Sequence, residues 1–244
     1  MTDVELRSGS CLSKNGLPSL PDKFVDIFIT DPPYSLVTHE RQRVGSNGRG
    51  RDISRSRDLC FKHLSAATRT RVAEQIGRLL RRWCLVFTDD AGLAGWRAAL
   101  ERAGLELVRT GVWVKEDSQP QFTGDRPAQG AEFIVIAHAS DERLDWNARG
   151  RRGVWTTNIV KGSRDEPRLH ETQKPLALMR QLVADFTDRG DLICDPFAGS
   201  GTTGVAARTM GRRFLGWEVN REYAAVARQR VGVTREQLDL FSVA

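Results

Sequence analysis

One short apolar run constrains the fold of this chain more than any other stretch. Residues 25–29 (VDIFI) are rich in β-branched and aromatic side chains, and Asp31, Pro32, Pro33 and Tyr34 follow almost directly. Proline fixes φ and has no N–H to donate, so the pattern predicts a buried strand that ends abruptly. In an open α/β sheet, such a strand end faces the ligand crevice. We therefore expect a carboxylate, a free backbone carbonyl and an aromatic ring at the mouth of a cleft.

This strand end is suited to a flat molecule that carries an amino group. Asp31 and the Pro32 carbonyl can accept the two N–H bonds of that group, and Tyr34 can stack on its ring. A plainer interpretation is a strand followed by a proline turn. The four residues by themselves do not decide between the two interpretations.

A glycine-rich turn marks a second strand end near the C-terminus. Residues 199–204 (GSGTTG) follow a predicted strand at 191–195 and lead into a predicted helix, and Glu218 ends the next predicted strand, 214–218. Glycines let a cofactor approach the backbone, and an acid at this place can bind a ribose diol. The pattern alone also fits a nicotinamide-dependent enzyme. However, no base for hydride transfer is evident, and the preceding DPF is not typical of that fingerprint.

Helices and strands alternate along most of the chain. Residues 4–12 predict a short strand and a turn. Helices are predicted at 68–82, 91–103, 174–188 and 220–231, and further strands at 85–87, 105–114 and 133–138. Alternation of this kind predicts a parallel, doubly wound α/β sheet.

Positive charge gathers in two polar segments, residues 35–60 and 140–169. The net charge of +6 favours a polyanionic partner, with nucleic acid first. Arginine at this density beside a cleft predicts phosphate contacts, and the alternative is a solvated loop. The candidate DNA-binding residues are Arg41, Arg43, Arg49, Arg51, Arg55, Arg57, Arg149, Arg151, Arg152 and Lys161.

The cysteines argue against a metal site and against disulfides. Cys11, Cys60, Cys84 and Cys194 are scattered and form no CxxC pair. No stretch is long and apolar enough to cross a membrane, and the N-terminus has no basic-then-apolar signal pattern. We therefore expect no bound metal, no membrane contact and a location in a reducing cytoplasm.

Three motifs together resemble those of amino-group DNA methyltransferases. Residues 31–34 (DPPY) resemble the catalytic motif, residues 195–202 (DPFAGSGT) the S-adenosylmethionine motif, and residues 170–175 (HETQKP) the H-x-x-Q-K-P that precedes it. The catalytic motif comes first, as in the circularly permuted β group. The resemblance implies a single Rossmann-like, S-adenosylmethionine-dependent methyltransferase domain over 1–244, with the catalytic half before the cofactor half.

The resemblance also implies roles for individual residues. Asp31, Pro32, Pro33 and Tyr34 would be the catalytic set, acting on a base that is flipped out of the duplex. Glu218 would hold the cofactor ribose. The full set expected at the cofactor is Ser10, Cys11, Asp31, Thr172, Lys174, Asp195, Phe197, Ala198, Gly199, Ser200, Gly201, Thr202, Glu218 and Val219.

The same resemblance suggests the target of the reaction. Asp rather than Ser at position 31 favours adenine N6 over cytosine N4. A cytosine-N4 methyltransferase and a non-catalytic DNA-binding subunit remain alternatives. Residues 140–169 occupy the place of the recognition segment, and their short length suggests a short or relaxed target sequence. Relatives are often homodimers, and they often carry Gly-Asp-Cys where this chain has an N-terminal Gly-Ser-Cys around Ser10.

The C-terminal tail, residues 233–244, holds one further motif. Its sequence QLDLF resembles the peptide by which bacterial replication proteins dock on the sliding clamp. A peptide at an exposed terminus can reach such a groove, whereas the alternative is that its apolar residues fold back onto the sheet or a second subunit. The residues expected to contact the clamp are Gln237, Leu238, Leu240 and Phe241.

Overall fold

The computed structural model describes residues 4–34, 64–118, 120, 124–162, 168–169 and 173–232. Within these ranges, no helix is both long enough and apolar enough to cross a membrane. Several predicted contact residues lie outside the described residues: Arg41, Arg43, Arg49, Arg51, Arg55, Arg57, Thr172, Gln237, Leu238, Leu240 and Phe241.

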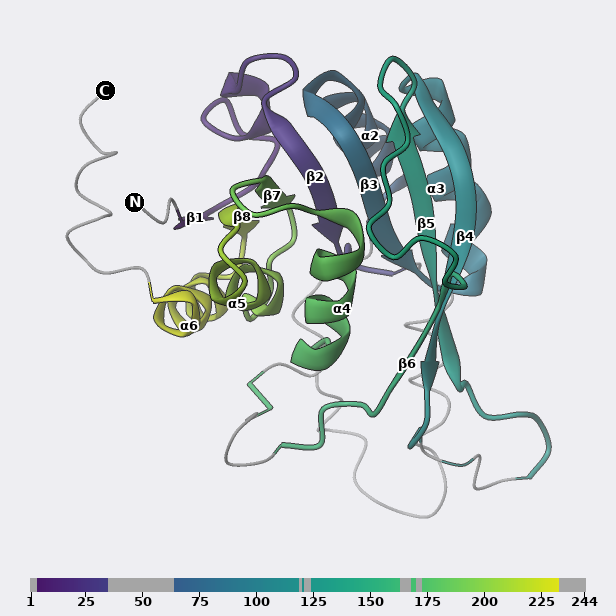
Figure 1. The fold of residues 1–244 in the computed structure, drawn as a ribbon. Coiled ribbons are helices and arrows are strands. Elements are labelled where there is room, and N and C mark those ends of the chain that lie inside the picture. The colour runs from purple at the N-terminus through teal and green to yellow at the C-terminus, as the bar shows by residue number, and fades with distance from the viewer. Residues whose placement is uncertain are drawn as a thin grey trace.

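The described chain forms an eight-stranded sheet in the order β1-β8-β7-β2-β3-β5-β4-β6, with helices on both faces (Figure 1). The apolar run of the sequence is β2, and the turn after β7 leads into α5. In chain order, the elements are β1 (Val4–Ser8), η1 (Leu17–Ser19), β2 (Val25–Thr30), α2 (Ala66–Leu79), β3 (Leu80–Thr88), α3 (Asp90–Arg102), β4 (Leu105–Lys115), β5 (Ala131–Ala139), β6 (Val154–Thr157), α4 (Leu176–Phe186), β7 (Leu192–Asp195), α5 (Thr202–Thr209), β8 (Arg213–Glu218) and α6 (Arg221–Val231).

The alternation of side chains along β2 divides the core into two layers. Ile27 and Ile29 pack with the apolar residues of α4, α5 and α6 on one face of the sheet. Phe28 points to the other face, where α2 and α3 cover it. Figure 1 shows the same separation, with α4 to α6 on one side of the sheet and α2 and α3 on the other. All of β2 is buried, which is typical of a central parallel strand.

The predicted parallel sheet is correct for one half of the sheet and wrong for β5. Strands β1, β8, β7, β2 and β3 pair in parallel, whereas β5 runs antiparallel to both β3 and β4. A parallel neighbour needs a long crossover, usually a helix. The described residues between β4 and β5 form no helix, so the two strands pair as an antiparallel hairpin. The short strand β6 was not predicted; it lies within 140–169 and pairs in parallel with β4.

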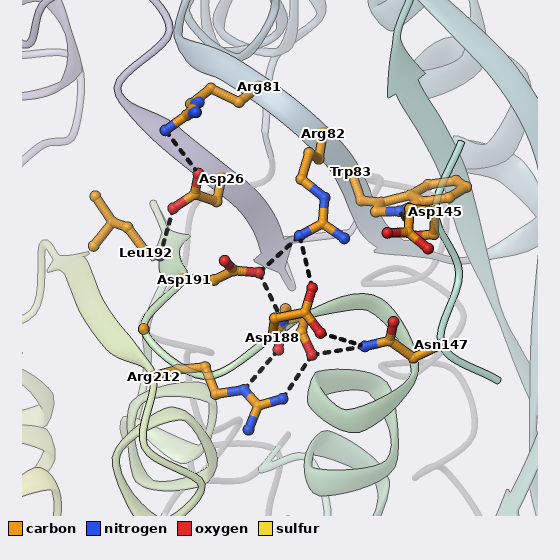
Figure 2. Close-up of polar contacts among 12 residues, drawn as sticks. Asp26, Arg81, Arg82, Trp83, Asp145, Asn147, Asp188, Asp191, Leu192 and Arg212 are labelled. Atoms are coloured by element: carbon orange, nitrogen blue, oxygen red, sulfur yellow. Dashed lines mark hydrogen bonds and ion pairs between the residues drawn. The ribbon is translucent and has the colours of Figure 1, made fainter. Parts of the chain in front are cut away.

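A polar network closes the amino-terminal edge of the parallel strands (Figure 2). Arg82, near the start of β3, places Nη1 3.0 Å from Asp191 Oδ2 and 3.4 Å from Asp188 Oδ2. Asn147 Nδ2 donates to Asp188 Oδ1 (3.1 Å) and to the Thr187 carbonyl (2.9 Å). These bonds fasten the start of the 140–169 segment to the connection between α4 and β7. The network bonds most of these groups to one another, although the buried Arg82 Nη2 has no hydrogen-bond partner among the described residues. The predicted site residues Asp31, Asp195 and Glu218 lie at the opposite edge of the sheet.

Candidate active site

The predicted site residues converge because parallel strands end at a common edge. Asp31 follows β2, Asp195 ends β7 and Glu218 ends β8. Ligands of open α/β sheets bind at this carboxyl edge. The antiparallel β5 contributes its amino end to the same edge, so Glu132 at its start lies beside Lys115 at the end of β4.

Asp31 has one carboxylate oxygen with a partner and one without. Its Oδ2 accepts a hydrogen bond from Lys174 Nζ at 2.6 Å. Its Oδ1 is buried and has no hydrogen-bond partner among the described residues. Burial raises the pKa of the Asp31 carboxyl, and the charge of Lys174 opposes that rise. A buried acceptor without a donor is costly, so this oxygen is suited to an N–H group of a ligand.

Lys174 lies among Asp31, Tyr34 and Glu132 and contacts all three. Its Nζ is 3.2 Å from Tyr34 Oη and 3.1 Å from Glu132 Oε2, in addition to its bond with Asp31. It also lies 5.0 Å from the ring centre of Phe87. Burial favours the neutral amine, but the charges of Asp31 and Glu132 raise the pKa of Lys174. The side chain that the sequence assigned to the cofactor is therefore a charged partner of Asp31.

Two contacts with charged side chains hold the side chain of Tyr34 in place. Its hydroxyl donates to Glu132 Oε2 at 2.5 Å, and its ring lies 5.4 Å from Lys174 Nζ. Burial, together with the neighbouring Asp31 and Glu132, raises the pKa of the Tyr34 hydroxyl, so the group stays neutral and donates. The ring is therefore held in one orientation beside Asp31, as stacking on a flat ligand requires.

Asp195 joins the end of β2 to the predicted cofactor turn. It accepts hydrogen bonds from Thr30 Oγ1 (2.8 Å), Thr203 Oγ1 (2.7 Å) and the backbone N–H of Phe197 (3.1 Å). Burial nevertheless raises the pKa of Asp195 to about 6. A single carboxylate thus holds the end of β2, immediately before Asp31, against the start of α5.

The glycine turn is shaped by two residues with positive φ. Gly199 has φ +52°, and a Cβ atom there would meet no atom within 4 Å. Gly201 has φ +83°, and its Cβ would lie 2.9 Å from the Cβ of Ala227 on α6. Arg230 of α6 also donates to the Ser200 carbonyl at 2.7 Å. The turn is therefore open toward the crevice at Gly199 and closed against α6 at Gly201.

Glu218 is held by the same turn. Its Oε2 accepts from the Gly199 N–H at 2.9 Å and its Oε1 from the Asn220 N–H at 2.7 Å. Each carboxylate oxygen has a further lone pair for another donor. Val219, the next residue, is 68% exposed. Ser10 lies at the neighbouring strand end, where its Oγ accepts from the Leu12 N–H at 3.2 Å.

These features fit S-adenosylmethionine. Gly199 leaves open space beside the turn, Glu218 offers acceptors for ribose hydroxyls, and Val219 offers an exposed apolar surface for an adenine ring. Cys11 is buried, and burial raises the pKa of its thiol to about 12, so it contributes apolar packing rather than a reactive thiolate. The predicted turn residues Phe197, Ala198 and Ser200 lie between β7 and α5, and Thr202 is the first residue of α5, at the same edge.

The described candidate DNA contacts all belong to the 140–169 segment. Arg149, Arg151, Arg152 and Lys161 are exposed. Arg151 Nη1 is 2.8 Å from Asp185 Oδ1, and Lys161 Nζ is 2.7 Å from an Asp117 oxygen. Their role in binding DNA stays a prediction.

Sequence reasoning missed Glu132 and Lys115. Lys115 Nζ is 2.6 Å from Glu132 Oε1, and Glu132 in turn contacts Lys174 and Tyr34. One signal was present: Glu132 is an acid near the start of an otherwise apolar strand, AEFIVIAHA. An acid at such a position is buried only when it has partners.

Comparison with known proteins agrees with this geometry. The family model described as DNA methylase, for N6 and N4 methyltransferases, matches residues 25–229. The type II methyltransferase M2.DpnII of Streptococcus pneumoniae is 27% identical over 239 residues, covering 90% of this chain and 87% of the relative.

Solved structures show the same fold. The M1.HpyAVI–SAM complex has a TM-score of 0.68 and 23% identity, covering 93% of this chain and 99% of its own. The cytosine-N4-specific PvuII DNA methyltransferase has a TM-score of 0.71 and 14% identity, covering 99% and 92%. The predicted Rossmann-like methyltransferase fold is therefore confirmed. The chain belongs to the N6/N4 DNA methylase family and is an S-adenosylmethionine-dependent DNA methyltransferase.

Proposed function

We propose that this methyltransferase modifies the exocyclic N6 amino group of adenine in DNA. The observation that supports an amino group as the target is the buried Oδ1 of Asp31, which has no partner among the described residues. The choice of adenine over cytosine is supported by Asp rather than Ser at position 31. It lies at the carboxyl edge of the sheet, beside a ring that Glu132 holds in place. An amino group that enters this place brings the donor that the oxygen lacks.

The pocket addresses the weakness of an exocyclic amine as a nucleophile. The lone pair of such an amine is delocalised into the ring. Asp31 Oδ1 and the Pro32 carbonyl would accept its two N–H bonds, which favours tetrahedral nitrogen and frees the lone pair. Positioning and fixed charges, rather than prior deprotonation, then supply the rate. The nitrogen would gain the methyl group as the bond from that carbon to the sulfonium sulfur breaks, and the sulfur would keep the electron pair as a thioether. The nitrogen would also lose a proton, for which Asp31 is the adjacent acceptor.

The cofactor would lie between the glycine turn and β8. When bound, S-adenosylmethionine supplies an electrophilic sulfonium methyl group. Phe197, Gly199 and Gly201 would line its methionine part, and Glu218 would bind the ribose hydroxyls. Asp195 aligns this half of the site with Asp31, because it binds Thr30 and Thr203 together.

A base in duplex DNA reaches this pocket only when it is flipped out of the stack. Tyr34 would then stack on the extruded base. The exposed Arg149 and Arg152 would contact backbone phosphates, which positions the duplex without reading its sequence.

Methyl transfer from labelled S-adenosylmethionine to DNA, followed by nucleoside digestion and mass analysis, tests the proposal. We expect N6-methyladenine from the wild type and no methylated base from Asp31→Ala, which should still bind the cofactor in a calorimetric titration. Asp141→Ala is a matched control. Asp141 is an exposed acid that pairs with Lys23, and it follows the carboxyl end of β5, at the edge of the sheet opposite to Asp31.

The other outcomes separate the alternatives. N4-methylcytosine would keep the mechanism and change the target base. Cofactor binding without any methylated base would favour a non-catalytic DNA-binding subunit. Near-normal turnover by Asp31→Ala would overturn the assignment of Asp31.

A further inference from the structure

Glu132 lies outside every motif of the sequence, yet it contacts the hydroxyl of Tyr34 in the catalytic motif and the ammonium group of Lys174. It is the second residue of β5, and it is 8% exposed. Its Oε2 accepts a hydrogen bond from the Tyr34 hydroxyl (2.5 Å) and lies 3.1 Å from Lys174 Nζ. Its Oε1 lies 2.6 Å from Lys115 Nζ. A buried carboxylate with three donors is a built part of the pocket and not a chance surface contact.

Lys174 is shared between two carboxylates. Its Nζ is 2.6 Å from Asp31 Oδ2 and 3.1 Å from Glu132 Oε2. If Asp31 were the sole partner, the full charge of the ammonium group would fall on that carboxylate and weaken it as an acceptor. Glu132 therefore draws part of this charge away from Asp31.

The charges of the cluster balance. Asp31 and Glu132 are the two acids, and Lys115 and Lys174 are the two bases. Removal of the Glu132 charge would leave a surplus positive charge beside Asp31, whereas removal of the Lys115 charge would leave a surplus negative charge. The two changes therefore act on Asp31 in opposite directions.

We propose that Glu132 is a positioning residue for methyl transfer, which binds Tyr34 and Lys174 together and thereby sets the strength of Asp31 as the acceptor of the target amino group. This inference rests on the proposed function for its catalytic consequence. Its electrostatic consequence is independent of activity, because Asp31 titrates whether or not a base is methylated. The charged and titratable groups that face Glu132 or Asp31 from the surrounding elements are Tyr34, Lys115, Lys174 and Asp195.

The test is the titration of Asp31 by carbon NMR in protein labelled at the aspartate carboxyl carbons, with Asp31→Asn to assign the signal. We expect Glu132→Gln to lower the Asp31 pKa by about one pH unit, since both carboxylates contact Lys174 Nζ and so lie within about 6 Å of each other. Lys115→Met should raise the Asp31 pKa by a smaller amount, because Lys115 acts on Asp31 across Glu132. The double variant should lie between the two.

Activity supplies the second measurement. We expect Glu132→Gln to lower kcat about tenfold or more with little change in the KM for S-adenosylmethionine, and to move the acid limb of the kcat profile to lower pH. Lys115→Met should move that limb to higher pH. A merely structural role would lower the thermal midpoint and cofactor affinity together, without opposite shifts of the acid limb.

The outcomes distinguish this inference from the function on which it rests. Opposite shifts of the Asp31 pKa in a protein that methylates no base would overturn the proposed function and support the electrostatic role of Glu132. An Asp31 pKa that both variants leave unchanged, or shift in the same direction, would overturn the inference. Lys115→Met alone tests it if Glu132→Gln does not fold.

Discussion

Asp195 gives the folded protein a pH dependence that can be calculated from its surroundings. Its carboxyl is buried between Thr30 and Thr203, and burial raises its pKa from 3.8 to about 6. The folded state therefore binds this proton more tightly than the unfolded state does. The stability that the protonated group contributes is fully present below about pH 4 and is lost as the pH rises through about 6. At about 1.4 kcal/mol for each pKa unit, the total loss is about 3 kcal/mol.

Asp195→Asn removes this titration and keeps a similar shape. Urea unfolding of both proteins, measured from about pH 4 to about pH 7, yields the difference in their free energies of unfolding. As the pH rises across that range, we expect the free energy of unfolding of the variant to increase by about 2 kcal/mol relative to that of the wild type. The change is smaller than the total loss of about 3 kcal/mol, because the wild type has already lost part of this stability at about pH 4. Groups that titrate in both proteins cancel in the difference, and so does any constant cost of the amide.

The sign of this pH dependence tests whether burial raises the pKa of Asp195. A difference that does not vary with pH would show that the Asp195 carboxyl keeps an ordinary pKa, and its three hydrogen bonds would then offset its burial completely. A difference that changes in the opposite direction would mean that the hydrogen bonds dominate and that the folded state favours the carboxylate.

Two further stability predictions follow from the packing. Gly201→Ala should destabilise the protein more than Gly199→Ala. Both substitutions cost about 1–2 kcal/mol, because each places a side chain on a left-handed backbone. Only Gly201→Ala also places a Cβ atom 2.9 Å from the Cβ of Ala227. Thermal unfolding should show this order, and equal midpoints would contradict it. Trp155→Phe should cost about 1–3 kcal/mol, because the buried Nε1 bond to Asp185 (2.9 Å) is lost; calorimetry measures it, and an unchanged midpoint would show that the bond is not needed.

Local patterns predicted the parts of the site that local chemistry determines. The buried strand before Asp31 has β-branched residues and a proline stop, and both act within a few residues. The turn at Gly201 needs a positive φ and no side chain, and glycine is the signal for both requirements. These features locate the catalytic and cofactor edges without knowledge of the tertiary pairing.

The features that local patterns missed depend on the direction and register of strands. The ion pair between Lys115 and Glu132 exists because β5 turns back on β4 and brings its amino end to the carboxyl edge. The missing helix between the two strands was the signal for this reversal, since parallel neighbours need a crossover. Strand β6 is only four residues long, and its Trp155 reads equally well as a residue of an irregular loop.

The reversal of β5 also affects the protonation of the buried Asp31, because it sets which charges lie near that carboxyl. Asp31 gains strength from a site with little water, but burial favours its protonated form. Lys174 opposes protonation through its contact with Oδ2, and Oδ1 stays open to a ligand. In the role proposed above, Glu132 limits how strongly Lys174 acts on Asp31, and only an antiparallel strand brings Glu132 to this edge. A parallel β5 would bring its other end, with the buried His138, to the same place. The antiparallel direction of β5 is therefore what places Glu132 beside Lys174 and Tyr34.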